Sequence, residues 1–211
     1  MGTIPCVDAD EDTVLLRRWR DGDRLSGDRL FQRHFHGVFR FFRNKTDESA
    51  AEELTQSTFL AVLNAAERFA GRSSFRTYVF SIARNQLLMH LRKRYSHGKV
   101  MDFGSISVAE LGVSPSEVLV GRQEQRLLLR ALRHVPIAMQ IVVELYYWEG
   151  LSTAEVAEVL EVAPGTVRSR LARARERISE EIERLAGDAA VAQSTVEGFE
   201  TWARKLRDAN T

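Results

Sequence analysis

Arginines crowd one short segment in the last third of the chain. Residues 164–178 place an apolar residue at every third or fourth position, which predicts a helix with one buried face. That face carries Val167, Leu171, Ala174 and Ile178, and the other faces carry Arg168, Arg170, Arg173, Arg175 and Arg177. Guanidinium groups form bidentate hydrogen bonds with phosphate oxygens and with the edge of guanine. The chemistry that this segment offers is therefore contact with a nucleic acid.

A second helix and a tight turn precede the arginine-rich helix. Ser152 and Glu155 have the spacing of a capping box, so a helix begins after Ser152. The chain turns at residues 161–163, and Pro164 suits the first turn of the next helix. A short helix, a turn and a basic amphipathic helix are typical of a helix-turn-helix that enters the DNA major groove. The alternative is a solvated basic face on an ordinary helical hairpin, but the arginine density and the position of the turn favour DNA.

A second cluster mixes aromatic rings, cations and small polar groups around Gly71. It comprises Phe69, Arg72, Ser73, Ser74, Phe75, Arg76, Thr77 and Tyr78, followed by Arg84, Asn85, Arg92, Lys93 and Arg94. Unpaired bases stack on rings while cations hold phosphates, and a loop of this kind can also receive a flipped base. The alternative is that Phe69 and Phe75 belong to the core, with Tyr78 at its border.

Acidic residues begin the helix before that cluster. Asp47, Glu48, Glu52 and Glu53 are followed one turn later by Gln56. Acids repel DNA, so this surface suits a basic protein partner. A solvated helix start explains the acids equally well when they are taken alone.

The overall composition restricts where nucleic acid can bind and which chemistries to expect. The chain has 30 Lys and Arg against 29 Asp and Glu, so a nucleic-acid surface must be local. Cys6 is the single cysteine, which fits a reducing cytoplasm, and we find neither a membrane-spanning run nor a signal sequence. We expect a cytoplasmic protein that does not insert into a membrane.

Enzymatic chemistry is the alternative of a different class. His34 and His36 are two residues apart and point to different sides of a helix, and no CxxC, HExxH or glycine-rich phosphate loop is present. We therefore expect no metal, no cofactor and no catalytic residue.

The helical patterns divide the chain into two units. We predict an all-α fold in which two small helical domains, residues 13–97 and 118–180, are joined by a flexible linker at 98–117 rich in Gly, Ser and Pro. Residues 1–12 are expected to be loose. Residues 181–211 form a helical extension, in which Val196, Phe199, Trp202 and Leu206 make an apolar stripe that packs on this protein or regulates it.

Three stretches of the chain together resemble a known family. They are residues 51–60 (AEELTQSTFL), residues 69–85 (FAGRSSFRTYVFSIARN), and residues 149–175 with EGLS at the start and GTVRSR and ARAR toward the end. In this order they look like a bacterial RNA polymerase sigma factor of the small extracytoplasmic-function group, over roughly residues 14–180. The two predicted domains correspond to the family's regions 2 and 4.

The resemblance implies a role for each cluster. Glu52, Glu53 and Gln56 stand at the contact with the polymerase β′ clamp helices, and the family also binds the β flap. The loop 69–74 stands where a flipped base of the −10 element is captured. The adjoining residues that melt or hold the −10 element are Arg76, Thr77, Tyr78, Arg84, Asn85 and Arg92. The residues that read the −35 element are Thr166, Arg168, Ser169, Arg173 and Arg175. The family is often held inactive by an anti-sigma protein.

Four positions depart from the family's usual residues. Glu53 replaces a common Asp, Tyr78 a common Trp and Gln140 a common Arg. Ala163 replaces a capping Ser, which should cost the helix that follows about 1 kcal/mol. The resemblance implies an alternative sigma factor that directs promoter recognition and melting; the alternative is a dimeric helix-turn-helix repressor or activator that works without core polymerase.

Overall fold

The computed structural model describes residues 7–65, 69, 71, 73–95, 100–113 and 123–201. The described residues form helices and no strand, apart from one isolated bridge between Ser107 and Pro136. The helices are α1 (Val7–Arg20), α2 (Arg24–Arg43), α3 (Glu48–Ala65), α4 (Phe75–Tyr95), α5 (Gln123–His134), α6 (Ile137–Val143), the π-helical segment η2 (Glu144–Trp148), α7 (Thr153–Leu160), α8 (Pro164–Leu185) and α9 (Ala189–Glu197). The predicted all-α fold is confirmed.

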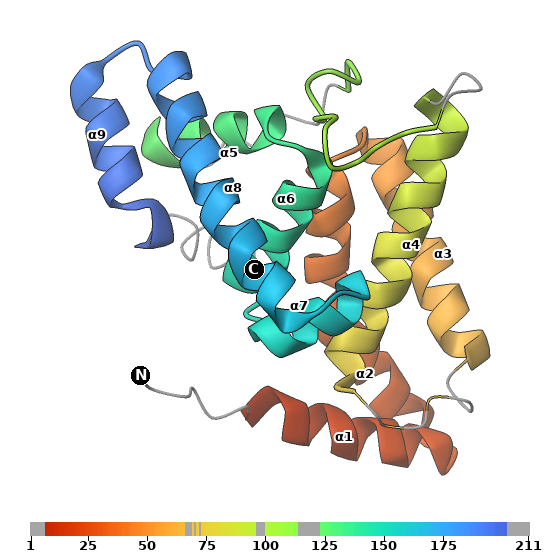
Figure 1. Ribbon diagram of the computed structural model, residues 1–211. Coiled ribbons are helices and arrows are strands. Elements are labelled where there is room, and N and C mark those ends of the chain that lie inside the picture. Colours follow the sequence, from red (N-terminus) through yellow and green to blue (C-terminus); the bar gives the residue numbers. More distant parts are fainter. Residues whose placement is uncertain are drawn as a thin grey trace.

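Helices α1 to α4 form the first unit (Figure 1). Helix α2 begins at Asp23, whose side chain accepts hydrogen bonds from the backbone N–H groups of Leu25 and Ser26. Its inner face buries Leu30, Val38 and Phe42, and it packs between α1 and α3, while α3 packs on α4. The aromatic residues of this segment therefore build the core that supports α3 and α4.

Helices α5 to α9 form the second unit, which contains the predicted helix-turn-helix. The Ser152 side chain accepts from the Glu155 N–H and the Glu155 side chain accepts from the Ser152 N–H, so the capping box is confirmed. The turn places Glu161 in the left-handed backbone region at φ 56°. Ala163 caps α8 without a side-chain hydrogen bond, as its apolar side chain requires. Helix α8 then buries Val167, Leu171, Ala174 and Ile178 as predicted.

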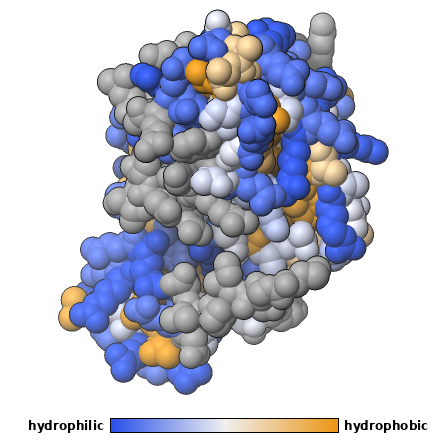
Figure 2. Space-filling model, turned by 90° about the vertical axis from the view of Figure 1, so that its left-hand side faces the viewer, coloured by the Kyte–Doolittle hydropathy of each residue, from blue (hydrophilic) through white to orange (hydrophobic). Residues whose placement is uncertain are grey.

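The extension packs on the second unit as far as residue 201. Helix α9 contacts α5 and α8, Thr195 is fully buried, and Phe199 packs edge-on against Tyr147 at 5.5 Å between ring centroids. Trp202 and Leu206, the other half of the predicted stripe, lie outside the described residues. Figure 2 shows the side of the molecule on which α9 lies, and most of the residues coloured there are hydrophilic.

The central part of the linker lies against the start of α6. The Ile137 N–H donates to the Ile106 carbonyl at 2.9 Å, and the Ala138 N–H donates to the Phe103 carbonyl at 2.9 Å. Phe103 and Val108 are buried. These two apolar side chains explain why residues 100–113 pack, although the segment is rich in glycine and serine.

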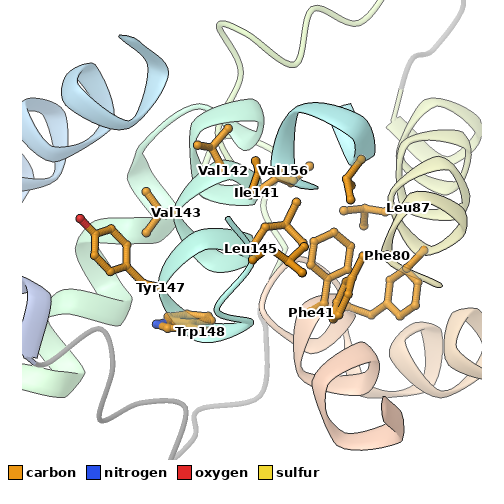
Figure 3. Packing of buried hydrophobic residues seen from close by; sticks show 14 of the residues in the cluster. Phe41, Phe80, Leu87, Ile141, Val142, Val143, Leu145, Tyr147, Trp148 and Val156 are labelled. Carbon is orange, nitrogen blue, oxygen red and sulfur yellow. The ribbon is translucent and has the colours of Figure 1, made fainter. Parts of the chain in front are cut away.

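The two units contact each other through an apolar layer. Phe41, Phe80 and Leu87 of α2 and α4 face Ile141, Leu145 and Val156 of the second unit (Figure 3). Helix α4 also packs along α7, as Figure 1 shows. Each of these six side chains is almost fully buried. The closed arrangement of the two units therefore removes substantial apolar surface from water.

A buried ion pair crosses the same contact. The Lys45 ammonium donates to a Glu144 carboxylate oxygen and, at 2.6 Å, to the Phe41 carbonyl. Gln140 donates to Glu144 at 2.8 Å and to the Asn44 carbonyl at 3.4 Å. Burial lowers the pKa of Lys45 and raises that of Glu144, because each charge loses its hydration, while their mutual attraction opposes both changes.

A second carboxylate joins two arginines of the first unit. Glu149 accepts from Arg40 at 2.7 Å and from Arg76 at 2.9 Å. Burial alone would raise the pKa of Glu149, but the charges and hydrogen bonds of the two arginines outweigh it and lower that pKa. Gly37 makes room for the pair, since a Cβ there would lie 2.7 Å from a Glu149 oxygen.

Removing one member of the Lys45–Glu144 pair should destabilise the protein far more than removing both. We expect Glu144→Ala to lower the free energy of unfolding by about 3–5 kcal/mol, because it leaves a buried ammonium uncompensated. The double variant Lys45→Met/Glu144→Leu should recover most of that loss. Urea unfolding followed by circular dichroism measures both.

The control is the exposed pair Arg184–Glu181, in which Arg184 has a side-chain exposure of 55%. Glu181→Ala should cost no more than about 1 kcal/mol. If Glu144→Ala lowers the free energy of unfolding as little as Glu181→Ala does, Lys45 and Glu144 do not form a buried, interacting pair.

Candidate nucleic-acid interface

Helix α8 presents most of the predicted −35 residues on its outer surface. Arg168, Ser169 and Arg173 are exposed, and Thr166 is partly exposed. At 100° per residue, Thr166, Ser169 and Arg173 share the face opposite the buried stripe, with Arg168 on one flank. A long helix packed on α5, α6 and α7 holds these side chains rigidly, as major-groove recognition requires.

Arg175 differs from the other predicted −35 residues because it already has partners. Its Nε donates to the Tyr147 hydroxyl at 2.8 Å, and one Nη lies 2.6 Å from a Glu200 carboxylate oxygen. Both partners stand on the side where α9 ends. A phosphate contact by Arg175 must therefore compete with Glu200 of the extension.

The predicted −10 loop is partly built into the core. Phe69 is 8% exposed and its ring contacts those of Phe75 and Tyr78, the latter at 4.7 Å between centroids. Tyr78 itself is partly exposed. Both phenylalanines are buried, as the core interpretation predicted, and Tyr78 keeps a surface for contact. Arg72 lies outside the described residues.

Three further −10 residues contact the second unit. Ser74 donates to Glu155 at 3.1 Å, Thr77 donates to the same oxygen at 3.4 Å, and Arg76 pairs with Glu149. Thr77 is only 1% exposed, although its side chain is polar. The reason is that α7 covers this end of α4, which no periodicity within α4 reveals. Ser73 is partly exposed beside them.

The far half of α4 carries the remaining predicted −10 residues. Arg84 is partly exposed, and Asn85 and Arg92 are exposed. Arg84 donates to the Asn85 side-chain oxygen at 3.1 Å, and the Arg92 guanidinium lies 5.2 Å from the Phe103 ring centroid. These groups form one basic strip along α4.

The acidic surface lies on α3, on the opposite side of the first unit from α7. Glu52, Glu53 and Gln56 are exposed, whereas Asp47 caps the start of α3 through the Ala50 N–H and pairs with Arg94. Leu60 and Leu63 continue the line of Glu53 and Gln56 and are 58% and 42% exposed. Sequence periodicity does not indicate this exposure, because it shows only that residues share a face and not which face is covered.

The described ranges hold no cluster of three or more His, Cys, Asp or Glu side chains that could bind a metal ion. His34 is buried and lies 2.7 Å from Asp12, which explains it as a core residue. Among the same residues, no helix has the length and apolar character needed to cross a membrane.

Solved structures share this fold. The chain is similar to CnrH, solved in complex with the cytosolic domain of CnrY, with a TM-score of 0.63 and 21% identity, covering 83% of this chain and 99% of that one. It is also similar to the sigma factor RpoE of Bartonella quintana, solved with the anti-sigma factor NepR, with a TM-score of 0.59 and 21% identity, covering 75% and 98%.

Curated relatives span nearly the same length. The ECF RNA polymerase sigma-E factors of Escherichia coli K12 and Salmonella typhimurium LT2 are each 26% identical over 182 residues, which cover 82% of this chain and 95% of the relative. That of Haemophilus influenzae is 25% identical over 182 residues, covering 82% and 96%.

Two family models match the two helical units separately. The model for sigma-70 region 2 matches residues 30–96, and that for sigma-70 region 4 matches residues 125–178. The first range contains the acidic surface, the −10 loop and most of α4; the second contains the helix-turn-helix. With both regions present in this order, the chain belongs to the sigma-70 family, in its extracytoplasmic-function group.

Proposed function

We propose that this chain is an alternative sigma factor that binds core RNA polymerase and directs promoter recognition and melting. The observation that carries the proposal is the presence of both sigma-70 regions in one chain, with an exposed acidic line on α3 and an exposed basic face on α8. A dimeric repressor needs only the helix-turn-helix and leaves region 2 unexplained. Core polymerase forms the phosphodiester bonds of the RNA, so we propose that the chain itself is not an enzyme.

The charge and position of each surface suggest which partner it binds. Thr166, Arg168, Ser169 and Arg173 read the −35 element from the exposed face of α8, and Arg175 holds phosphate. The −10 element is contacted by Ser73, Ser74, Arg76, Thr77 and Tyr78, with Phe69 beneath them. Along α4, the same contact is extended by Arg84, Asn85 and Arg92. Glu52, Glu53 and Gln56 bind the β′ clamp helices, with Leu60 and Leu63 in line to extend the interface, and region 4 binds the β flap.

The two units must separate for this function. The −35 and −10 elements lie about 25 base pairs apart, which is about 85 Å along B-DNA. In this structure the hydroxyl oxygen of Thr77, on the −10 surface, lies 3.4 Å from a carboxylate oxygen of Glu155, in the helix-turn-helix. The closed arrangement therefore represents the chain away from the promoter. The interface suits reversible opening, because buried polar atoms such as Gln140 Oε1 and Arg76 Nε lack a protein partner among the described residues and would gain water.

An anti-sigma protein is the expected regulator, since RpoE and NepR were solved together as sigma and anti-sigma factor. Such a partner acts by hiding the α3 surface or by holding the units closed. We propose that the chain acts in the cytoplasm, where its proposed partner polymerase is found, and the single cysteine, Cys6, supports this.

Run-off transcription tests the function directly. Core polymerase from the host, supplied with the full-length chain and genomic fragments, should produce transcripts that core polymerase alone does not. If the folded chain yields no such transcript from any fragment, the sigma-factor proposal is wrong.

The Glu53→Lys variant tests the polymerase surface. It places a cation where a basic partner is expected, so affinity for core polymerase should fall by about tenfold or more while the melting temperature stays unchanged. Asp28→Lys is the matched control, because Asp28 is also an exposed acid but lies on α2. Co-elution or fluorescence anisotropy measures the affinity. Equal binding by the Glu53→Lys variant and the wild type would remove Glu53 from the interface.

The Arg168→Ala variant tests base reading at the −35 element. A bidentate arginine contributes about 1–3 kcal/mol of discrimination, so its loss should flatten the preference among −35 variants. Arg177→Ala, exposed on the same helix, should at most weaken binding to all sequences alike. Transcription from a promoter set altered one base at a time gives the comparison. If the Arg168→Ala variant keeps the preference among −35 sequences and binds all of them more weakly, Arg168 contacts phosphate only.

A further inference from the structure

A small cavity of about 250 Å³ lies where the two units meet. Its walls come from α4 of the first unit, the linker, and α6, α7 and α8 of the second unit. It therefore exists only while the units are packed together. Its volume is below the range of about 300–1,000 Å³ typical of drug-sized ligands, so it suits a compact ligand.

Three arginines from both units line this cavity: Arg84 and Arg92 from α4, and Arg170 from α8. Arg170 lies on the opposite flank of α8 from Arg168, facing α4 rather than the expected major-groove side. The three charges act on each other, since burial together with the charges of Arg170 and Arg92 lowers the pKa of Arg84. Three guanidinium groups around one small space concentrate positive charge in the cavity.

Acidic groups nearby do not neutralise the three cations. Asp102 lines the cavity, and one of its oxygens accepts the Gly104 N–H at 2.9 Å. Glu161 attracts Arg84 electrostatically from the end of α7. In the part of the chain that the structure describes, none of the three arginines forms an ion pair with a carboxylate. Arg84 donates instead to the neutral Asn85 side chain, and Arg92 stacks over Phe103.

We propose that this cavity binds a small phosphate polyanion of the size of pyrophosphate, which bridges α4 and α8 and holds the two units closed. Planar guanidinium groups match phosphate oxygens in paired, charge-assisted hydrogen bonds. Leu88, Ile141 and Leu160 form the apolar part of the wall. The ligand occupies two arginines that the proposed function assigns to the −10 element, so it opposes promoter binding; that consequence rests on the proposed function.

Phosphate groups of DNA are the other source of the same chemistry. Promoter DNA requires the units to be far apart, so it cannot fill a cavity that both units form. A free polyanion should stabilise the closed state, and DNA should stabilise the open one. The two sources are therefore distinguished by the distance between the units.

Titration of the full-length chain with sodium pyrophosphate, in the absence of polymerase, tests the binding. Isothermal calorimetry should show saturable binding that sulfate at equal ionic strength does not reproduce. Arg170→Gln should weaken the affinity by about tenfold or more, since it removes a charge-assisted hydrogen bond to the phosphate. Arg130→Gln, an exposed arginine on α5, is the matched control and should bind as the wild type does. Arg92→Gln replaces Arg170→Gln if the latter fails to fold.

A second readout follows the distance between the units. Donor and acceptor dyes at Asp28→Cys and Glu176→Cys, in a Cys6→Ser background, report on the closed state by energy transfer. Pyrophosphate should maintain or raise the transfer, whereas a short duplex carrying the promoter should lower it. Non-saturable binding, an Arg170→Gln variant that binds normally, or a fall in transfer on adding pyrophosphate each overturns the proposal. The three overturning outcomes need neither polymerase nor a known promoter, so failure of the sigma-factor assay leaves them interpretable.

Discussion

The arrangement of the molecule depends on charge buried between its two halves. Lys45 and Glu144 lose their hydration together, and Glu149 lies between Arg40 and Arg76. Such pairs add little stability relative to well-packed apolar side chains, but they are satisfied in only one relative orientation. The apolar layer of Phe41, Phe80 and Leu145 drives the association, and the ion pairs fix its register. On separation the charged groups return to water, so opening costs less than it would for a purely apolar contact of equal area.

The same helices serve the closed state and the promoter. Helix α4 contacts α7 through Ser74 and Thr77, which the proposed function assigns to the −10 element. Helix α8 leaves its outer face exposed but directs Arg170 toward α4 and engages Arg175 with Tyr147 and Glu200. Contacts within the chain and contacts with DNA therefore compete for the same side chains. The acidic line on α3 takes no part in this competition, so the proposed polymerase contact stays exposed in the closed chain.

Local features were predictable from the sequence, and contacts between distant segments were not. The helix-turn-helix followed from the Ser152–Glu155 capping box, Pro164 and the periodicity of α8, all of which act within a few residues. The burial of Thr77 depends on α7, which lies about 80 residues further on and has no signal in the α4 pattern. Glu144 and Glu149 look like ordinary surface acids in the sequence, because only the fold brings Lys45, Arg40 and Arg76 to them. The exposure of Leu60 and Leu63 has no signal in the sequence either, because periodicity does not show which face of α3 is covered.

The ion pairs of Glu144 and Glu149 depend on the π-helical turn at Glu144–Trp148. Its i→i+5 pattern, seen in the bond from the Glu149 N–H to the Glu144 carbonyl at 3.0 Å, stacks the two acids toward the same side of the helix. In a regular α-helix, positions i and i+5 are separated by about 140° around the axis. With α-helical hydrogen bonds at this turn, the same sequence would therefore direct Glu149 away from the side of Glu144 and from Arg40. Backbone geometry, as well as side-chain identity, thus specifies the closed form.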